Sequence, residues 1–208
     1  MPAVGIRQRG AGMLSVVIAT ENSERPLVLT LSALVPGATA GVVREVIVAD
    51  AGSRDGTAGV ADVAGCRFLT SLAPLGARLK SAAASAKGPW LLFLRPGVVP
   101  QANWVEETDR FLSEGALVAG ADERAAVFRR VPGAAGQPRA TILQAFSLVL
   151  SALRGRPRPD QGLLMTKNLY ERLGGHSADG ADPETGLLRR LGRRRIITLR
   201  CGAGMAPH

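Results

Sequence analysis

Short apolar runs rich in β-branched residues recur along the first half of the chain, each followed by polar turn residues and an apolar pattern of helical spacing. The runs that predict strands are Leu14–Ala19, Glu45–Ala49, Arg67–Thr70 and Trp90–Leu94. The patterns that predict helices are Pro26–Leu34, Thr57–Ala64 and Pro74–Lys87. Strands and helices that alternate at this spacing are typical of βαβ units, so we expect a largely parallel sheet flanked by helices.

The pattern is less regular after residue 100. We expect a helix over Trp104–Leu112, short strands over Ala116–Val118 and Ala126–Phe128, and an apolar segment of one helix length over Thr141–Leu153. The last unit has strand-like runs at Gly162–Thr166 and Ile196–Leu199 and helical patterns at Lys167–Leu173 and Glu184–Leu191. No internal repeat is present, so we expect one domain over residues 1–208, with a first half at 14–100 and a second half at 101–200.

Composition places the chain among globular proteins. Its 208 residues are 46% hydrophobic and 21% charged, which excludes a disordered or fibrous chain. The two cysteines, Cys66 and Cys201, are too few for a disulfide framework or a zinc cluster. No run reaches the roughly 18 apolar residues that a membrane span requires.

The N-terminus has one feature of a secretory signal, because Arg7 and Arg9 precede the apolar run Met13–Ala19. That run is short and β-branched, it ends at the polar residues 21–25, and no small-residue cleavage site follows it. A buried strand is therefore the favoured interpretation, and a cytoplasmic location is expected.

Positive charge is concentrated in the second half of the chain. Residues 1–119 carry 11 basic and 10 acidic side chains, whereas residues 120–208 carry 15 and 7, and the formal net charge is +9. This balance favours an anionic partner: a phosphate-bearing substrate, a lipid headgroup surface or a nucleic acid. Aromatic residues make up only 4% of the chain, too few to stack on bases between the charges, so we expect no nucleic-acid partner.

Ligands of parallel α/β sheets bind at the carboxyl ends of the strands. Those ends bring Thr20–Glu24, Asp50–Asp55 and Arg95–Gly97 to one rim of the expected sheet. The sharpest pattern among them is a strand-end carboxylate, Asp50, followed by the loop Gly52-Ser53 and a helix N-terminus. Such a loop makes a nucleotide pocket, in which the carboxylate binds base or ribose and backbone N–H groups face phosphate. The alternative is an ordinary turn, in which these residues only satisfy the backbone.

Four blocks of sequence carry a more specific resemblance. Residues 45–57 (EVIVADAGSRDGT) resemble the VVDDGSTDGT block of family-2 glycosyltransferases with the GT-A fold, with Ala51 in place of the second aspartate. Residues 14–24 (LSVVIATENSE), 75–94 (LGARLKSAAASAKGPWLLFL) and 160–175 (DQGLLMTKNLYERLGG) resemble three further blocks, in the family's order. The resemblance covers about residues 14–200 and is strongest to short bacterial members without membrane helices.

The resemblance implies a GT-A-like fold: a mixed, mainly parallel sheet flanked by helices, with a Rossmann-like nucleotide-binding half at 14–100 and an acceptor-side half at 101–200. It implies transfer of a sugar from a nucleotide-diphosphate donor to an acceptor hydroxyl. The donor-site positions that carry over are Thr20, Asn22 and Glu24 on the first-strand loop, Asp50 as the base-binding aspartate with Gly52 and Ser53 beside it, and Arg78 in the helix block. The acceptor-side positions are Asp160 and Gln161.

The first departure from the family pattern concerns a metal. Where the family has an Asp-x-Asp-type motif that holds Mg²⁺ or Mn²⁺ against the donor diphosphate, this chain reads Arg95-Pro96-Gly97, with no acid before Glu106. A hard cation needs oxygen ligands, so we expect no metal site there. Arg95 is a candidate to contact the diphosphate bidentately and to replace part of the metal's charge. The alternative is a solvated loop residue in a decayed site.

The second departure concerns the family's Glu-Asp pair near the second-half helix, which aligns with Pro183-Glu184. Glu184 is the candidate general base that deprotonates the acceptor hydroxyl, and Asp182 is a nearby substitute for the missing acid. The leading expectation is therefore a glycosyltransferase that works without an Asp-x-Asp-bound metal. The alternative is a catalytically inactive GT-A-like binding module.

Two segments are candidates for membrane contact. The arginines Arg189-Arg190 and Arg193–Arg195 suit phosphate or an anionic membrane, which would put the chain at the periphery of the inner membrane face. A solvated helix end is the simpler interpretation of these charges. Thr141–Leu153 is a candidate to lie against a membrane or an acceptor lipid, although core packing is favoured.

Overall fold

The computed structural model describes residues 13–117, 123–131 and 157–206. Its strands are β1 (Leu14–Thr20), β2 (Val43–Asp50), β3 (Arg67–Thr70), β4 (Trp90–Leu94), β5 (Val98–Pro100), β6 (Ala125–Arg130), β7 (Leu163–Thr166) and β8 (Ile196–Met205). Its α-helices are α1 (Glu24–Thr39), α2 (Thr57–Val63), α3 (Leu75–Ser85), α4 (Trp104–Leu117), α6 (Lys167–Arg172) and α7 (Pro183–Leu191). Two short 3₁₀ turns are η2 (Pro159–Gln161) and η3 (Arg193–Arg195).

The eight described strands form one mixed sheet in the order β3-β2-β1-β4-β7-β6-β8-β5. β3, β2, β1 and β4 run parallel, as the strand–helix alternation predicts. The direction reverses at β7, which is antiparallel to both β4 and β6, while β8 is parallel to β6 and antiparallel to β5. All five residues of the central strand β4 are buried, because helices cover both faces of the sheet there.

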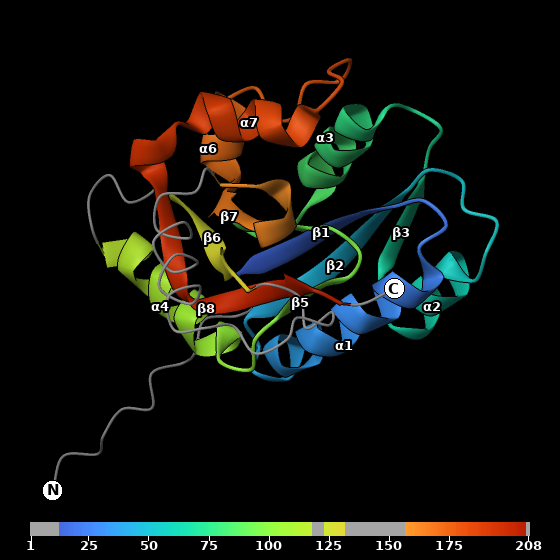
Figure 1. Cartoon of the computed structure of the whole chain (residues 1–208), viewed down its shortest axis with the longest axis horizontal. Coiled ribbons are helices and arrows are strands. Elements are labelled where there is room, and N and C mark those ends of the chain that lie inside the picture. Colours follow the sequence, from blue (N-terminus) through green and yellow to red (C-terminus); the bar gives the residue numbers. More distant parts are fainter. Residues whose placement is uncertain (1–12, 118–122, 132–156, 207–208) are drawn as a thin grey trace, which may run out of the picture.

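The helices form one layer on each face of the sheet (Figure 1). On one face α1, α2 and α4 bury apolar side chains such as Leu27, Ala61 and Trp104 in a core with the strands. On the other face α3, α6 and α7 contribute a second core that includes Leu79 and Leu187. The sheet therefore lies between two apolar cores, and its strand ends remain at the rim.

Several elements are longer than the sequence pattern predicts. α1 continues past Leu34 through Pro36 to Thr39, although proline removes a helical donor. Packing explains this, because Gly37 lies against the ring of Trp104, whose Nε1 donates to the Ala33 carbonyl at 2.9 Å. The expected strand at 116–118 is wrong for residues 116 and 117, which end α4, and residue 118 lies outside the described residues.

The sheet also gains an edge that the sequence pattern does not predict. β5 is short and ends in proline, and β8 extends past Leu199 through a glycine-rich stretch to Met205. A Cβ at Gly202 would lie 2.3 Å from Val131 Cγ2, so glycine is required there by close approach. The apolar segment Thr141–Leu153 lies outside the described residues.

An apolar groove of about 500 Å³ opens between α1 and α2. Its lining differs from the polar and charged loops at the rim of the sheet. Val28, Val35 and Val63 line it and are all exposed. It holds no charged side chain and so does not suit a phosphate-bearing ligand. Within the described residues, no helix has the length and apolar character needed to cross a membrane.

Candidate functional site

The parallel strands end together and so bring the predicted loops to one edge. Thr20, the last residue of β1, is in register with Asp50, the last residue of β2. Leu94 at the end of β4 is in register with Ile18, so Arg95 follows at the same edge. The loops after β1, β2 and β4 are therefore neighbours, as the sequence predicts.

Asp50 is the buried centre of this edge, with only 1% of its surface exposed. One carboxylate oxygen accepts hydrogen bonds from Thr20 Oγ1 at 2.7 Å and Ser53 Oγ at 2.5 Å. The other accepts from the backbone N–H groups of Gly52 at 2.8 Å and Ser53 at 2.7 Å. Burial opposes ionisation of Asp50, but the hydrogen bonds from Ser53, Thr20 and Gly52 outweigh it and lower its pKa below its ordinary value. Asp50 thus orders its own loop, and contact with a nucleotide base stays a prediction.

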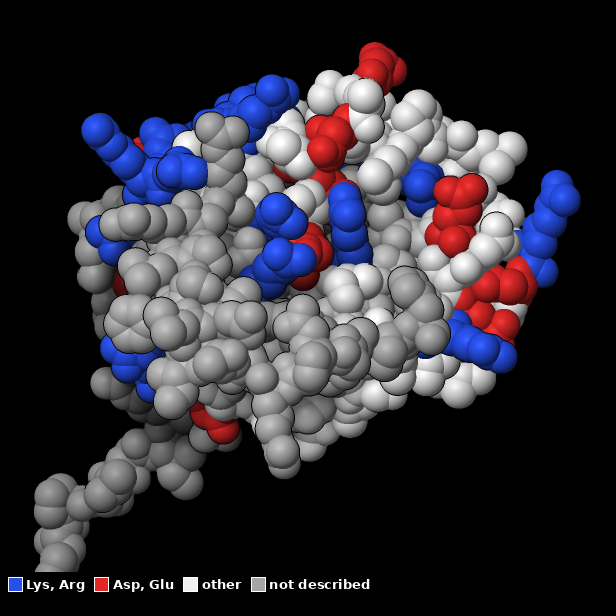
Figure 2. Space-filling model, in the orientation of Figure 1, with Lys and Arg blue, Asp and Glu red and all other residues white. Residues whose placement is uncertain are grey.

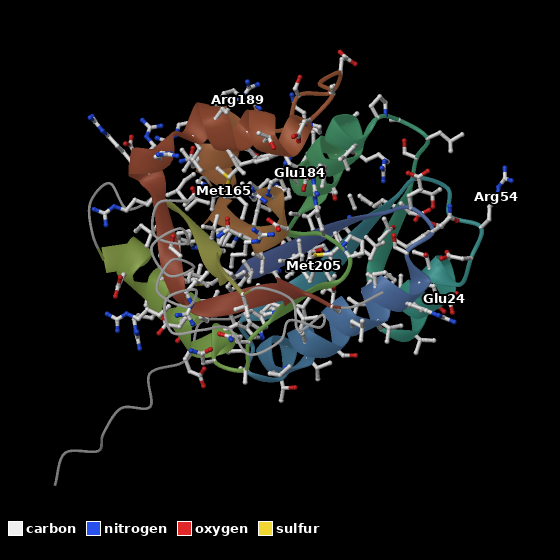
Figure 3. The ribbon with its side chains drawn as sticks, viewed as in Figure 1. Glu24, Arg54, Met165, Glu184, Arg189 and Met205 are labelled. Atoms are coloured by element: carbon white, nitrogen blue, oxygen red, sulfur yellow. The ribbon has the colours of Figure 1, made fainter. Side chains whose placement is uncertain are left out.

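The loop after β1 is bound directly to the loop after β2. Asn22, at a positive φ of 45°, receives the Arg54 N–H on its side-chain oxygen at 2.9 Å, and its own N–H donates to Ser53 Oγ at 2.8 Å. Glu24 accepts from the Gly56 N–H at 3.0 Å. Figure 3 shows Glu24 at the start of α1 and Arg54 on the adjoining loop, directed outward. Asn22 and Glu24 therefore hold the two loops together.

Asp55 joins the two loops and also binds the first N–H of α2, the capping role for which the sequence makes it a candidate. Its carboxylate accepts from the Glu24 N–H at 3.0 Å and from both the N–H and hydroxyl of Thr57. The hydrogen bond from the Thr57 hydroxyl is the main reason that the pKa of Asp55 is lowered. The sequence signal for the capping role is the position of Asp55, two residues before the start of α2 in the Asp-Gly-Thr block.

Arg78 on α3 lies beneath the same edge and is 8% exposed. Its guanidinium donates to three backbone carbonyls: Ala49 at 2.6 Å, Thr20 at 3.1 Å and Ala73 at 3.2 Å. No acidic side chain in the described part of the chain lies within ion-pair distance of it. Arg78 thus fastens the ends of β1 and β2 and brings a positive charge to this edge.

Arg95 meets Glu184 across 89 residues of sequence. The Arg95 Nε donates to the two Glu184 carboxylate oxygens at 2.9 and 3.2 Å, and Nη2 donates to the nearer one. The Arg95 side chain is 46% exposed and that of Glu184 is 15% exposed. The hydrogen bond that Arg95 donates to Glu184 is the main reason that the pKa of Arg95 is raised. Two residues predicted for different roles are therefore partners in this structure.

The loop that precedes α7, and so leads to Glu184, is fixed by contacts from α3 and from α7. Gly76 of α3 approaches it so closely that a Cβ there would lie 1.8 Å from the Ser177 carbonyl oxygen. Arg190 of α7 donates to the carbonyls of Leu173 and Gly175, both at 2.5 Å. Figure 3 places Glu184 at the end of α7 that faces α3, and Arg189 on the outer surface. This packing sets the start of α7 over the strand ends.

A buried pair, Tyr170 and His176, supports the same loop. The Tyr170 hydroxyl lies 2.9 Å from His176 Nδ1 and accepts from the His176 N–H at 3.1 Å. Burial, assisted by the charge of Arg190, lowers the pKa of His176 to about 4. Burial raises the pKa of Tyr170 to about 12. Both rings are therefore neutral at pH 7.

Of the remaining predicted residues, Asp182 and Asp160 act on Arg95 through their charge, while Gln161 binds elsewhere. Asp182 is the N-cap of α7 and accepts from the Thr185 N–H at 3.1 Å; hydrogen bonding by the Thr185 side chain, and then by this N–H, lowers its pKa. Asp160 lies 3.5 Å from Arg130 Nε, and its buried Oδ1 has no hydrogen-bond partner among the described residues. Gln161 donates to the Phe128 carbonyl at 2.9 Å and is engaged in holding η2.

This edge does not suit a divalent cation. Among the described residues, no group of three or more His, Cys, Asp or Glu side chains is arranged to hold a metal ion. At the end of β4 the side chain is a cation, Arg95, which would repel one. We therefore derive no chemical step through a metal at this edge.

The mixed sheet, its helical layers and the loops at the carboxyl ends of β1, β2 and β4 define the GT-A fold of nucleotide-sugar glycosyltransferases. Solved structures of two proteins in complex with UDP have a similar fold. Glucosyl-3-phosphoglycerate synthase from Mycobacterium tuberculosis, in complex with Mn²⁺, UDP and glucosyl-3-phosphoglycerate, is 21% identical over 94% of this chain and 70% of its own, with a TM-score of 0.60. TarS 1–349 from S. aureus in complex with UDP is 15% identical over 93% of this chain and 60% of its own, with a TM-score of 0.64.

At these identities the similarity establishes the fold. No protein-family model matches the chain, and no curated protein sequence matches it. The chain spans between 60% and 70% of the length of these structures, so the activities of those proteins are not transferred with the fold.

Proposed function

We propose that the chain is a glycosyltransferase that transfers a sugar from a nucleotide-diphosphate donor to an acceptor hydroxyl, without a metal bound by an Asp-x-Asp motif. The observation that carries the proposal is the meeting of Asp50, Arg78, Arg95 and Glu184 at one edge of a GT-A sheet. Two proteins that share the fold are named as UDP complexes, which supports a nucleotide ligand at this edge.

The donor side of the proposed site is cationic. Arg78 supplies a positive charge beneath the loops, and Arg95 presents a guanidinium with a half-exposed side chain at the strand end. A guanidinium suits phosphate because it donates parallel hydrogen bonds to two oxygens. In this proposal the two arginines stabilise the negative charge that the departing diphosphate gains as the sugar leaves.

The acceptor side of the proposed site is acidic. Glu184 and Asp182 stand in the first turn and at the cap of α7, and Asp160 lies across from them. In this proposal Glu184 takes the proton from the acceptor hydroxyl as its oxygen attacks the anomeric carbon. Asp160 and Gln161 are proposed to border the acceptor.

Turnover across a panel of UDP- and GDP-sugars tests the proposal, with and without EDTA. We expect donor hydrolysis or transfer that EDTA leaves within about twofold, since no step depends on a cation. Arg95→Gln should lower the rate about a hundredfold or more, as the loss of a donor to developing charge does in other sites. Lys80→Gln on the exposed face of α3 is the matched control. Activity that requires Mn²⁺ would refute the metal-independent reaction.

The second candidate is a GT-A-like binding module without turnover. The ion pair between Arg95 and Glu184 favours it, because each group occupies the other in this structure. Tight binding of UDP or GDP with no consumption of any donor in the panel would select this candidate over the enzyme.

Peripheral contact with an anionic membrane is proposed for the arginines beyond the site. Arg189 and Arg193–Arg195 are exposed at the end of α7 and in η3. Basic side chains gather at the upper left of Figure 2, the region in which Figure 1 draws α7. Each basic residue near an anionic surface contributes about 1 kcal/mol. Sedimentation with phosphatidylglycerol vesicles but not with phosphatidylcholine vesicles is the expected result; equal sedimentation with both would contradict it.

A further inference from the structure

The guanidinium of Arg95 and the carboxylate of Glu184 form a charge-assisted ion pair. Nε of the arginine donates to both carboxylate oxygens, and Nη2 donates to Oε2 alone. A guanidinium binds the oxygens of a phosphate group with the same N–H donors. The carboxylate of Glu184 therefore occupies the face of Arg95 on which a diphosphate would bind.

Neither residue has an equivalent second partner in the described chain. Asp182 and Asp160 act on Arg95 only through their charge, and the carboxylate of Asp182 is engaged with Thr185. Glu184 accepts hydrogen bonds from Arg95 and is only 15% exposed, so solvent alone compensates it poorly. Each group is consequently held by the other until a ligand intervenes.

From this geometry we infer that Glu184 competes with the donor diphosphate for Arg95, so that donor binding and release of the general base are one event. The inference rests on the proposed function and deepens it. A diphosphate carries more negative charge than a carboxylate and draws the guanidinium away from Glu184. Glu184 is then freed beside the acceptor, and it accepts a proton only when a donor is present.

The competition weakens nucleotide binding by a measurable factor. A ligand that needs a free Arg95 binds with an apparent Kd raised by the reciprocal of the fraction of molecules in which the pair is open. A pair open about one tenth of the time raises the apparent Kd about tenfold. Removing the carboxylate should therefore tighten binding, although it removes a predicted catalytic group.

Isothermal titration calorimetry of the full chain with UDP and with GDP tests this inference. We expect Glu184→Gln to bind the better of the two nucleotides about tenfold more tightly than the wild type, and Arg95→Gln to bind it more weakly. In an Arg95→Gln background the Glu184→Gln change should have no effect, because the competed group is gone. Asp179→Asn, an exposed residue of the loop before α7, removes the same charge without touching Arg95 and is the control.

A nuclear magnetic resonance measurement on the wild-type chain tests the inference if Glu184→Gln does not fold. The Arg95 Nε–H resonance of the wild-type chain, assigned by its loss in Arg95→Gln, should move when UDP is added. The uridine nucleoside, which lacks phosphate, should leave it in place.

The outcomes separate the inference from the proposed function. Wild-type binding that Glu184→Gln leaves unchanged or weakens, or a resonance that stays fixed as UDP binds, overturns the inference and leaves the proposed function standing. An equal gain in Asp179→Asn also overturns it, because the effect would then be general charge. Absence of nucleotide binding in both the wild type and Glu184→Gln overturns the proposed function and the inference with it.

Discussion

Replacement of Asp50 tests whether its carboxylate holds the rim of the sheet. Asp50→Ala removes the acceptor of four hydrogen bonds, two from the backbone N–H groups of Gly52 and Ser53 and two from the hydroxyls of Thr20 and Ser53. A hydrogen bond contributes about 1 kcal/mol net, and an unsatisfied buried donor costs more. The expected loss in the free energy of unfolding is about 4 kcal/mol.

Asp50→Asn should cost far less, about 1–2 kcal/mol, because an amide can meet the same partners. Its oxygen can face the two backbone N–H groups, and its NH₂ group can donate to the two hydroxyls, which rotate to accept. Only the contribution of the carboxylate's charge to these bonds is lost. The difference between the two substitutions therefore follows from the partners of each oxygen.

Urea denaturation followed by tryptophan fluorescence measures both variants, since Trp90 and Trp104 are buried in the folded chain. Asp62→Ala on the exposed face of α2 is the control and should change stability by less than about 0.5 kcal/mol. A loss below about 1 kcal/mol for Asp50→Ala, or equal losses for Asp50→Ala and Asp50→Asn, would refute the assignment of these bonds.

Further predictions concern the supports of the site. The free energy of unfolding should fall by about 3 kcal/mol as the pH drops from 6.5 to 4. The reason is that the unfolded state binds a proton at His176 over this range and the folded state does not. Denaturation curves of His176→Asn should lack that part of the pH dependence. Gly37→Ala should destabilise the fold by about 1–2 kcal/mol, since its Cβ would meet a tryptophan ring at 2.3 Å. Gly59→Ala, with open space around it, should stabilise the fold by about 0.5–1 kcal/mol. The order of the two thermal midpoints checks this pair. Arg78→Met should cost about 2–4 kcal/mol through three lost bonds to carbonyls and Lys80→Met less than about 0.5, and a similar cost for both in urea would contradict the role given to Arg78.

The first half of the fold could be predicted because its information is local. β3 and β4 begin and end at the residues that the apolar runs predict; β1 and β2 each end one residue later than predicted, and β2 begins two residues earlier. Strand-end reasoning also finds Thr20 and Asp50 together, because parallel strands end at one edge. These strand patterns can be identified without knowing which distant residues are in contact.

The second half and the contacts of the site could not be predicted in this way. β8 contains Gly202 and Gly204, which have low strand propensity and are chosen by close approach to other segments. The pairing of Arg95 with Glu184 depends on how α7 docks on α3, which no spacing in the chain encodes. The sequence pattern does not distinguish an Asp50 that binds a ligand from one that binds its own loop, because the difference lies in the geometry of its hydrogen bonds in the folded chain.

The mutual bonding of the loops after β1 and β2 has a practical consequence for crystallography. Immobilising one flexible backbone residue costs about 1–2 kcal/mol of entropy, and folding has already immobilised Asn22, Ser53 and their neighbours. A nucleotide that arrives at this rim needs little rearrangement of its walls. Crystals grown without ligand should accordingly tolerate soaking with UDP or GDP, and the main shift between empty and soaked lattices should be confined to one arginine rotamer.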